Sequence, residues 1–349
     1  MNSYYIIFAV IVFAIAVVVS IFSKYKPNKQ KKTDFLYTDA LNAMLRADKR
    51  KAISLLKDIV KQDSDHVDAY LQLGNIVRDD DPQRALNIHQ MLTVRPNLEN
   101  NIRIEIYKSL AMDYENIGDL KSSKKEAEHV LKLDKQNQWA LSFLLNLGEK
   151  LKDWDYSEDM AKRLQKITGN FNDEELAKYL VFRSEEKIRE KEFEAAEILL
   201  NNAIKRAPEY GLPYKFIGEI KMAKRELVEA IDCWEKFINL SPQHSHKVFD
   251  KMESALFDLG RYSEVEKFYR KVLEKDSMNV VGSLRLANVL NEKGEDKAAI
   301  KLINGIINNG SASISILLMK LKLSLSIQTP AELGHQIDTI ITQIGKNVD

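Results

Sequence analysis

The sequence YLQLGNIVRDDDPQRALNIHQMLTVRP, residues 70–96, shows how this chain folds. Apolar residues recur every three or four positions on both sides of Asp80–Asp81–Pro82, which is typical of two helices joined by a turn. Gly74 in the first segment and Ala85 in the second are small, as expected where two helices cross closely. The stretch therefore predicts a helical hairpin.

Similar hairpins recur along the chain at a nearly constant interval. A small or short side chain occupies the matching place in each second helix, at Ala52, Ala85, Ser123, Ser157, Ala195, Ala230, Val265 and Ala299. The separations are 33, 38, 34, 38, 35, 35 and 34 residues, close to the tetratricopeptide period of about 34 residues. Larger residues such as Trp234 and Phe237 are expected to fill the spaces between hairpins.

This period predicts an all-α fold in which about eight to nine hairpins stack into a superhelical tetratricopeptide solenoid with a concave groove. We expect about eight repeats over residues 34–312 and capping helices over 313–349. The repeats are predicted at 33–66, 67–99, 102–137, 138–172, 174–209, 211–245, 246–279 and 280–312.

The amino terminus carries a long uncharged run, residues 3–23, within which Tyr4 to Phe22 contains no Gly or Pro. About 20 apolar residues suffice to cross a membrane as a helix, so residues 1–23 are predicted to be a transmembrane anchor. No Lys precedes the run and five follow it, which argues against a cleaved signal and places the amino terminus outside and the remainder in the cytoplasm. A buried core helix or a signal peptide is the alternative. Residues 24–33 are expected to form a basic, mobile juxtamembrane tether.

The overall composition excludes several classes of function. The 52 basic and 51 acidic residues give a formal charge of +1. The chain therefore has no large excess of positive charge that would attract nucleic acid. Cys233 is the one cysteine, which allows no disulfide within the chain and no cysteine-based metal site. Its position inside a predicted second helix favours a small buried core residue over a nucleophile.

The sequence contains no catalytic constellation. We find no Gly-rich phosphate loop, no HExxH and no GxSxG. An enzymatic function is therefore the least supported interpretation. His244 and His246 are two residues apart in a predicted junction, but no other ligands cluster with them. His66 and His129 are expected at capping or solvated positions. We therefore predict no catalytic residue, no metal and no cofactor.

Surface recognition is the stronger interpretation, because the first helix of each tetratricopeptide hairpin lines the groove. Residues three or four apart share one face of a helix, and Asn and Arg can bond a peptide backbone or a carboxylate. The alternative is that these are only solvated polar residues. The candidate protein-binding residues are Asp68, Leu71, Asn75 and Arg78 in the second repeat, and Leu284, Asn288 and Asn291 in the eighth.

The stretch AYLQLGNIVRDDDPQRALNIHQML, residues 69–92, resembles the second repeat of the bacterial lipopolysaccharide assembly protein B family. The resemblance is carried by LGN, Arg78, Arg84–Ala85 and Ile88–His89–Gln90, with Asp113–Tyr114 and Gly118 in the next repeat. The order of a single amino-terminal span, a basic segment and then repeats also matches, so the resemblance extends over nearly the whole chain.

The resemblance implies a non-enzymatic adaptor at the inner membrane of a Gram-negative cell. Members of that family regulate lipopolysaccharide synthesis by helping the membrane protease FtsH degrade the lipid A deacetylase, and they answer to an inner-membrane signalling protein. The family also has a rubredoxin-like metal domain with two cysteine pairs. With Cys233 alone, metal dependence does not carry over to this chain. A scaffold for another envelope complex, such as secretion or pilus machinery, is the second interpretation.

Overall fold

The computed structural model describes residues 29–308, 313–325 and 327–345. Over these ranges the chain is helical and contains no strand, which confirms the all-α prediction. The expected span, residues 3–23, lies outside the described residues. Residues 29–33 of the expected tether belong to the first described helix. No helix in the described part of the chain has both the length and the hydropathy needed to cross a membrane.

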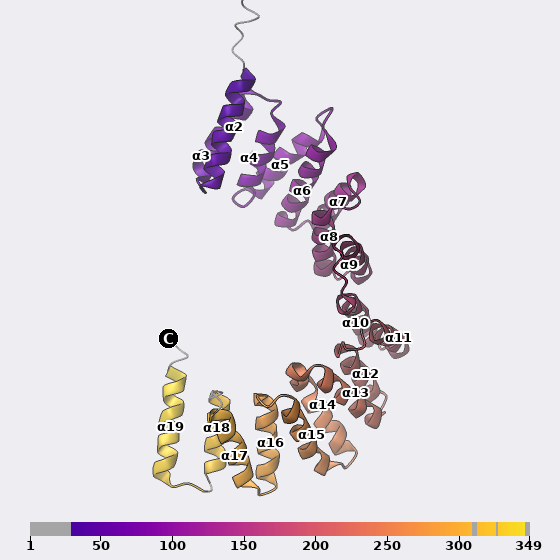
Figure 1. Ribbon diagram of the computed structural model, residues 1–349, viewed down its shortest axis with the longest axis vertical. Helices are drawn as coiled ribbons and strands as arrows, with labels where there is room; N and C mark the ends of the chain where they lie inside the picture. Colours follow the sequence, from indigo (N-terminus) through magenta and orange to yellow (C-terminus); the bar gives the residue numbers. More distant parts are fainter. Residues whose placement is uncertain (1–28, 309–312, 326, 346–349) are drawn as a thin grey trace, which may run out of the picture. The chain divides into compact units, whose positions relative to one another are not determined.

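Contacts between residues divide the chain into two units, which meet in sequence at Gly169 and Asn170. The described helices of the first unit, coloured indigo to purple in Figure 1, alternate between the first and second helices of hairpins. They are α2 (Lys29–Leu45), α3 (Lys49–Gln62), α4 (Val67–Val77), α5 (Pro82–Thr93), α6 (Asn100–Ile117), α7 (Leu120–Leu133), α8 (Gln138–Leu151) and α9 (Trp154–Thr168).

The second unit continues the alternation with one added element, the short 3-10 helix η1 (Pro242–Val248). This turn precedes the seventh hairpin, whose first helix is short. The α-helices are α10 (Asp173–Arg189), α11 (Phe193–Arg206), α12 (Leu212–Ala223), α13 (Leu227–Leu240), α14 (Phe249–Asp258), α15 (Tyr262–Lys275), α16 (Val280–Glu292), α17 (Asp296–Asn308), α18 (Ile314–Ser324) and α19 (Pro330–Gly345).

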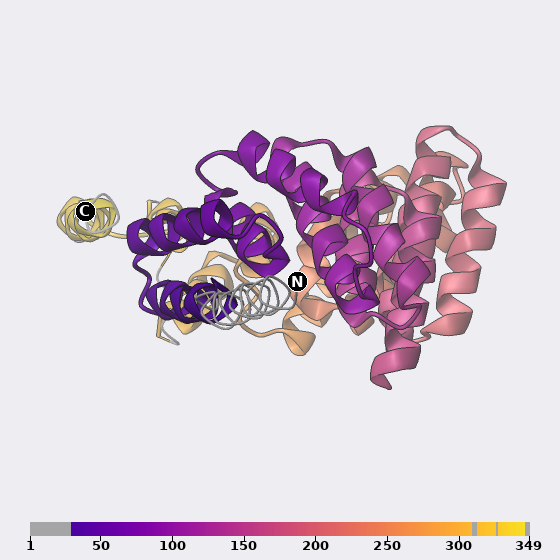
Figure 2. The same ribbon diagram turned by 90° about the horizontal axis from the view of Figure 1, so that it is seen from above.

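Within each unit each helix packs against the next one in the chain, and in most hairpins the two paired helices share the most extensive contacts. Figure 2 looks down onto the first unit and shows its helices lying side by side. Within each unit the first helices of adjacent hairpins also touch, as α4 touches α6, α10 touches α12 and α16 touches α18. In each unit we call the row of first helices its wall, since first helices of neighbouring hairpins lie next to one another in such a stack.

The turns set where the second helices begin in the first unit. Asp48, Asp81, Asp119 and Asp153 each occupy the N-cap, and each carboxylate accepts a hydrogen bond from the backbone N–H three residues later. This bond satisfies one of the free amides of the first turn and stabilises a helix by about 1 kcal/mol. Because the same residue type recurs at the same place, each hairpin turns at a defined point.

The small residues predicted in the second helices are buried, with one change of register. Seven of the eight, from Ala52 to Ala299, are at most 2% exposed. In α11 it is Ala196 that is fully buried, whereas Ala195 is half-buried. The repeat position therefore falls one residue later than predicted in the fifth hairpin. Cys233 is likewise half-buried rather than fully buried as expected.

Two first-helix glycines, Gly74 and Gly218, accommodate a ring, whereas Gly148 lies against Ser157, the small residue predicted in its second helix. A β-carbon on Gly74 would lie 2.3 Å from Nε2 of His89, and one on Gly218 would lie 2.4 Å from Nε1 of Trp234. Each ring lies four residues, one helical turn, after the buried alanine of its helix. Trp234 is fully buried and donates from Nε1 to the backbone carbonyl of Lys215 at 3.2 Å. The expectation that Trp234 and Phe237 fill interior space is confirmed, since both are buried.

Candidate protein-binding surface

The four candidate residues of the second repeat differ widely in their access to a partner. Asp68 lies in the first turn of α4 and is exposed, and Asn75 is half-buried. Leu71 and Arg78 are only 6% and 8% exposed. The periodicity places all four on or near one face, but packing against the next hairpin covers part of that face.

Arg78 forms the centre of a buried polar network between the second and third hairpins. Its Nε donates to Oδ1 of Asp113 on α6 at 2.5 Å. Its Nη2 donates to Oδ1 of Asn75 at 2.6 Å and to the carbonyl of Ser109 at 3.3 Å. Charge-assisted hydrogen bonds of this kind are about twice as strong as neutral ones. The guanidinium therefore uses these donors to join α4 to α6.

His89 completes this network from the second helix. Its Nδ1 lies 2.5 Å from Oδ2 of Asp113, and its Nε2 lies 3.1 Å from the carbonyl of Leu71. A carbonyl only accepts hydrogen bonds, so Nε2 is the donor to Leu71. The ring also fills the space above Gly74, where any side chain would collide with it. We call Arg78, Asp113 and His89 the buried triad.

The buried triad explains why the family-like residues occur together in sequence. Gly74, Asn75 and Arg78 belong to LGN and the residue one turn beyond it, and His89 lies 24 residues before Asp113. Together they hold one hairpin to the next in a single geometry. This role was missed from the sequence, although Arg78 and Asp113 are 35 residues apart, which places them one repeat from each other.

The three candidates of the eighth repeat lie in the second unit on α16. Leu284 is half-buried and packs against the apolar core of that unit. Asn288 accepts from Nζ of Lys322 on α18 at 2.9 Å, and Asn291 donates from Nδ2 to Asp296 at 2.7 Å. Asn291 thus closes its own hairpin, whereas Asn288 joins two first helices. The row of the second repeat therefore lies in the first unit, and the row of the eighth repeat lies in the second.

Ion pairs between first helices extend along the second unit, and these were also missed. Arg285 of α16 pairs with Asp250 at 2.5 Å and with Glu253 at 3.0 Å, both on α14. Lys251 of α14 pairs with Glu219 of α12. The partners are 32 or 35 residues apart, so opposite charges one repeat apart are the sequence signal that could have found them.

Burial affects the electrostatics of this wall. Burial raises the pKa of the Glu185 carboxyl on α10 above its ordinary value, although the positive charges of Lys215 and Arg189 act to lower it. In the first unit, Trp139 and Phe143 of α8 stack with ring centroids 4.9 Å apart, and Lys150 of α8 pairs with Glu115 of α6 at 2.5 Å. Ion pairs between residues about one repeat apart therefore join first helices in both units.

Of the two histidines predicted at capping or solvated positions, His66 is a cap and His129 is neither a cap nor exposed. His66 caps α4, since its Nδ1 accepts from the backbone N–H of Ala69 at 3.3 Å. His129 is half-buried against the ring of Tyr107, with centroids 5.0 Å apart. His244 and His246 are exposed on η1. In the described ranges no group of three His, Cys, Asp or Glu side chains is arranged to hold a metal ion.

Comparison with known proteins agrees with the resemblance drawn from residues 69–92. Lipopolysaccharide assembly protein B of Escherichia coli strain K12 is 23% identical over 276 residues, which are 78% of this chain and 71% of that protein. The chain is similar to lipopolysaccharide assembly protein B. The protein of the same name from Haemophilus influenzae is 24% identical over 293 residues, 80% of this chain and 72% of that one. The expected resemblance is confirmed.

Other comparisons add less detail. No protein-family profile matches the chain. A solved tetratricopeptide repeat protein from Parabacteroides merdae superposes with a TM-score of 0.38 at 13% identity, covering 84% of this chain and 99% of that one.

Proposed function

We propose that this chain is a non-enzymatic adaptor that binds protein clients and regulates lipopolysaccharide biosynthesis. The observation that supports this proposal is the similarity to lipopolysaccharide assembly protein B over about four fifths of the chain. The helical hairpins suit such a role, because stacked hairpins present long surfaces to other proteins. Among the described residues no arrangement of side chains points to a reaction of its own.

In the specific form of the proposal, the adaptor promotes proteolysis of the lipid A deacetylase by the membrane protease FtsH. Residues 3–23 anchor the chain in the inner membrane with the amino terminus outside, and the hairpins lie in the cytoplasm. Tethering confines the client beside the protease and raises its effective concentration without any new contact. Replacing residues 3–23 with an unrelated span tests whether the anchor only tethers, in which case deacetylase turnover stays unchanged.

We propose that clients contact the accessible members of the two candidate rows. Asp68 offers an exposed carboxylate, and half-buried Asn75 uses its Oδ1 within the network, which leaves its Nδ2 group available as a donor. Asn288 likewise accepts with Oδ1 and retains a donor. Leu71 and Arg78 support the surface from beneath, because both are buried.

The deciding measurement is the half-life of the lipid A deacetylase in a deletion strain that carries the wild-type chain or a variant. We expect the wild-type chain to shorten the half-life, and Asp68→Lys to lengthen it because the new charge repels a partner that the carboxylate attracts. Asp58→Lys, at an exposed site on the second helix α3, is the matched control.

A deacetylase half-life that deletion leaves unchanged would reject the specific form. Stable stoichiometric co-purification with other envelope proteins in the same strain would then favour the scaffold interpretation.

A further inference from the structure

A cavity of about 270 Å³ lies where the second hairpin passes into the third. It is bordered by the loop after α5 and by the first two turns of α6, entirely within the first unit. Two arginines, Arg95 and Arg103, line it, and no Asp or Glu does so among the described residues around it. The cavity therefore carries two positive charges without a carboxylate in its wall.

Arg95 is held in place by groups that leave its charge uncompensated. Its Nη2 donates to the backbone carbonyl of Ser64 at 2.6 Å, and its guanidinium lies 4.8 Å from the centre of the Tyr70 ring. The nearest carboxylate is that of Asp65, 3.9 Å away and 97% exposed. An ion pair so open to water contributes little. Arg95 is thus rigid before any ligand arrives, which lowers the entropic cost of binding.

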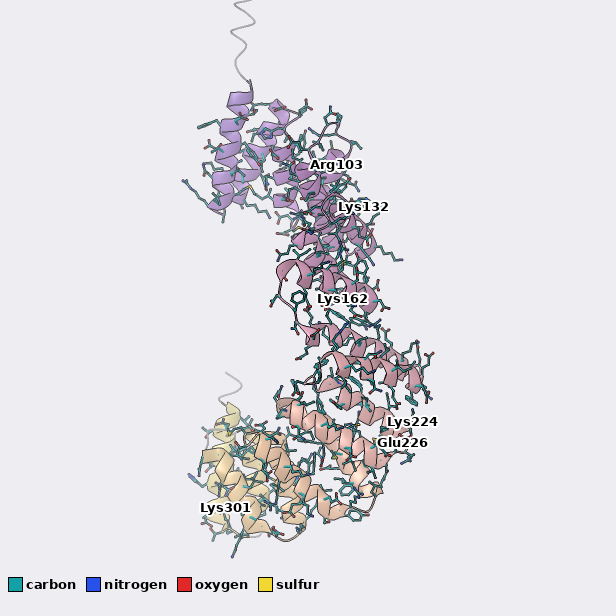
Figure 3. The ribbon with its side chains drawn as sticks, turned by 45° about the vertical axis from the view of Figure 1, so that its right-hand side comes forward. Arg103, Lys132, Lys162, Lys224, Glu226 and Lys301 are labelled. Carbon is teal, nitrogen blue, oxygen red and sulfur yellow. The ribbon has the colours of Figure 1, made fainter. Side chains whose placement is uncertain are left out.

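Unlike Arg95, Arg103 is not held in place. Its guanidinium has no hydrogen-bond or ion-pair partner within the described part of the chain. It is exposed and lies in the first turn of α6, on the purple part of the ribbon in Figure 3. The amino-terminal end of a helix carries partial positive charge and favours anions, so a cation there is locally unfavourable. Residues that break a local rule without a structural gain are commonly functional.

The other residues that line the cavity suit a small organic group. Ile106 is 1% exposed and forms part of the floor, with Leu98 and Tyr107 beside it. Asn97, in the left-handed conformation with φ of 57°, brings a polar group to the loop side. The volume is near the lower end of the roughly 300–1,000 Å³ that is typical of ligand pockets. The cavity fits a compact ligand with one charged end.

We propose that this cavity binds a phosphate monoester through Arg95 and Arg103. A phosphate monoester carries a charge of about −1.5 to −2 near neutral pH, which matches the two guanidinium groups, whereas a single carboxylate would leave one of them uncompensated. The planar donor fork of arginine suits two phosphate oxygens at once. The ester group then lies against the apolar walls. This site is independent of the client-binding surface.

Isothermal titration of the full-length chain in detergent tests the proposal with three probes: inorganic phosphate, glycerol 3-phosphate and a water-soluble short-chain phosphatidic acid. We expect all three to bind, with the esters tighter than inorganic phosphate. Tighter binding of the short-chain phosphatidic acid than of glycerol 3-phosphate identifies a lipid headgroup as the natural source, and equal or weaker binding identifies a soluble phosphate ester.

Variants decide whether the binding occurs at this cavity. Arg103→Ala is expected to weaken glycerol 3-phosphate binding at least tenfold while the melting temperature stays the same, because its guanidinium holds no part of the fold. Arg103→Lys is expected to recover part of the affinity. Arg46→Ala removes the same charge from another exposed site of the first unit and is the matched control. Equal affinity in Arg103→Ala and wild type, no heat with any probe, or tighter Arg103-dependent binding of an acidic peptide than of the esters would overturn the proposal.

Discussion

Replacing Asp113 with alanine is expected to destabilise the second and third hairpins by about 3–5 kcal/mol. The carboxylate is fully buried, and it accepts from Arg78 and from His89 at 2.5 Å each. A hydrogen bond to a charged group contributes about 1.5–3 kcal/mol, so two such bonds give a loss of that size. The loss is large because Arg78, whose side chain is 10% exposed, would keep a buried charge without its counterion.

A double-mutant cycle separates the interaction energy of the Arg78–Asp113 pair from the cost of burying each charge. Arg78→Met and Asp113→Leu are each expected to be costly, whereas the double variant is expected to cost less than the sum of the two. The reason is that the double variant leaves neither Arg78 nor Asp113 as a buried, unpaired charge, and an apolar pair of similar volume packs well. His89 loses its Asp113 partner in Asp113→Leu and in the double variant alike, so that loss cancels in the cycle. A coupling energy of about 1–3 kcal/mol is expected for groups in direct contact.

The measurement is native-state hydrogen exchange of the full-length chain, because a long repeat array does not unfold in one step. The opening free energies of amides in α4, α5 and α6 are expected to fall in Asp113→Ala, while those in α12 and α13 of the other unit stay the same. Asp58→Ala, which removes an exposed carboxylate, is the control and is expected to change neither. A loss below about 1 kcal/mol in α4 to α6, or additive single and double variants, would refute the role given to the triad.

Two further predictions concern a glycine and a tyrosine. Gly74→Ala is expected to cost about 1–3 kcal/mol by overpacking, because its β-carbon would lie 2.3 Å from the held ring of His89; Gly305→Ala in α17, where nothing lies within 4 Å, is expected to stabilise by up to about 1 kcal/mol. Native-state hydrogen exchange of the amides in α4 and in α17 checks this, and equal effects would contradict it. Burial and two nearby carboxylates raise the pKa of Tyr210 from 10.0 to about 12. A raised pKa favours the protonated form in the folded state, so this stability is constant below pH 10 and is lost as the pH rises to 12. The difference in urea midpoint between wild type and Tyr210→Phe, followed against pH, is expected to decrease over that window, and a constant difference would count against it.

Much of the fold could be predicted because its signals are local. The hairpin turn at Asp80–Asp81–Pro82 follows from a cap and a proline that act within one turn of helix. The spacing of the small residues likewise arises from a contact between two helices that are neighbours in the sequence. The register failed at Ala195, because two adjacent alanines satisfy the same sequence pattern and packing selects only Ala196.

The candidate surface was less predictable, because accessibility depends on the neighbouring hairpin. Asn75 and Arg78 were both expected to face a client. The structure turns Arg78 toward Asp113, which enters from a helix 35 residues further along. The sequence shows that both residues exist, but it does not show that their side chains meet. The cavity beside Arg95 and Arg103 was missed for the same reason.

The sequence by itself determined that the chain is helical, that it repeats about every 34 residues, and that it resembles lipopolysaccharide assembly protein B, because periodicity and caps act over a few residues. Only the tertiary structure decided which polar side chains are committed to the interior and which remain for a partner. The physical reason is that a single hairpin cannot bury its own apolar face. Burial, and with it the pairing of Arg78, Asp113 and His89, arises only when one hairpin stacks on the next.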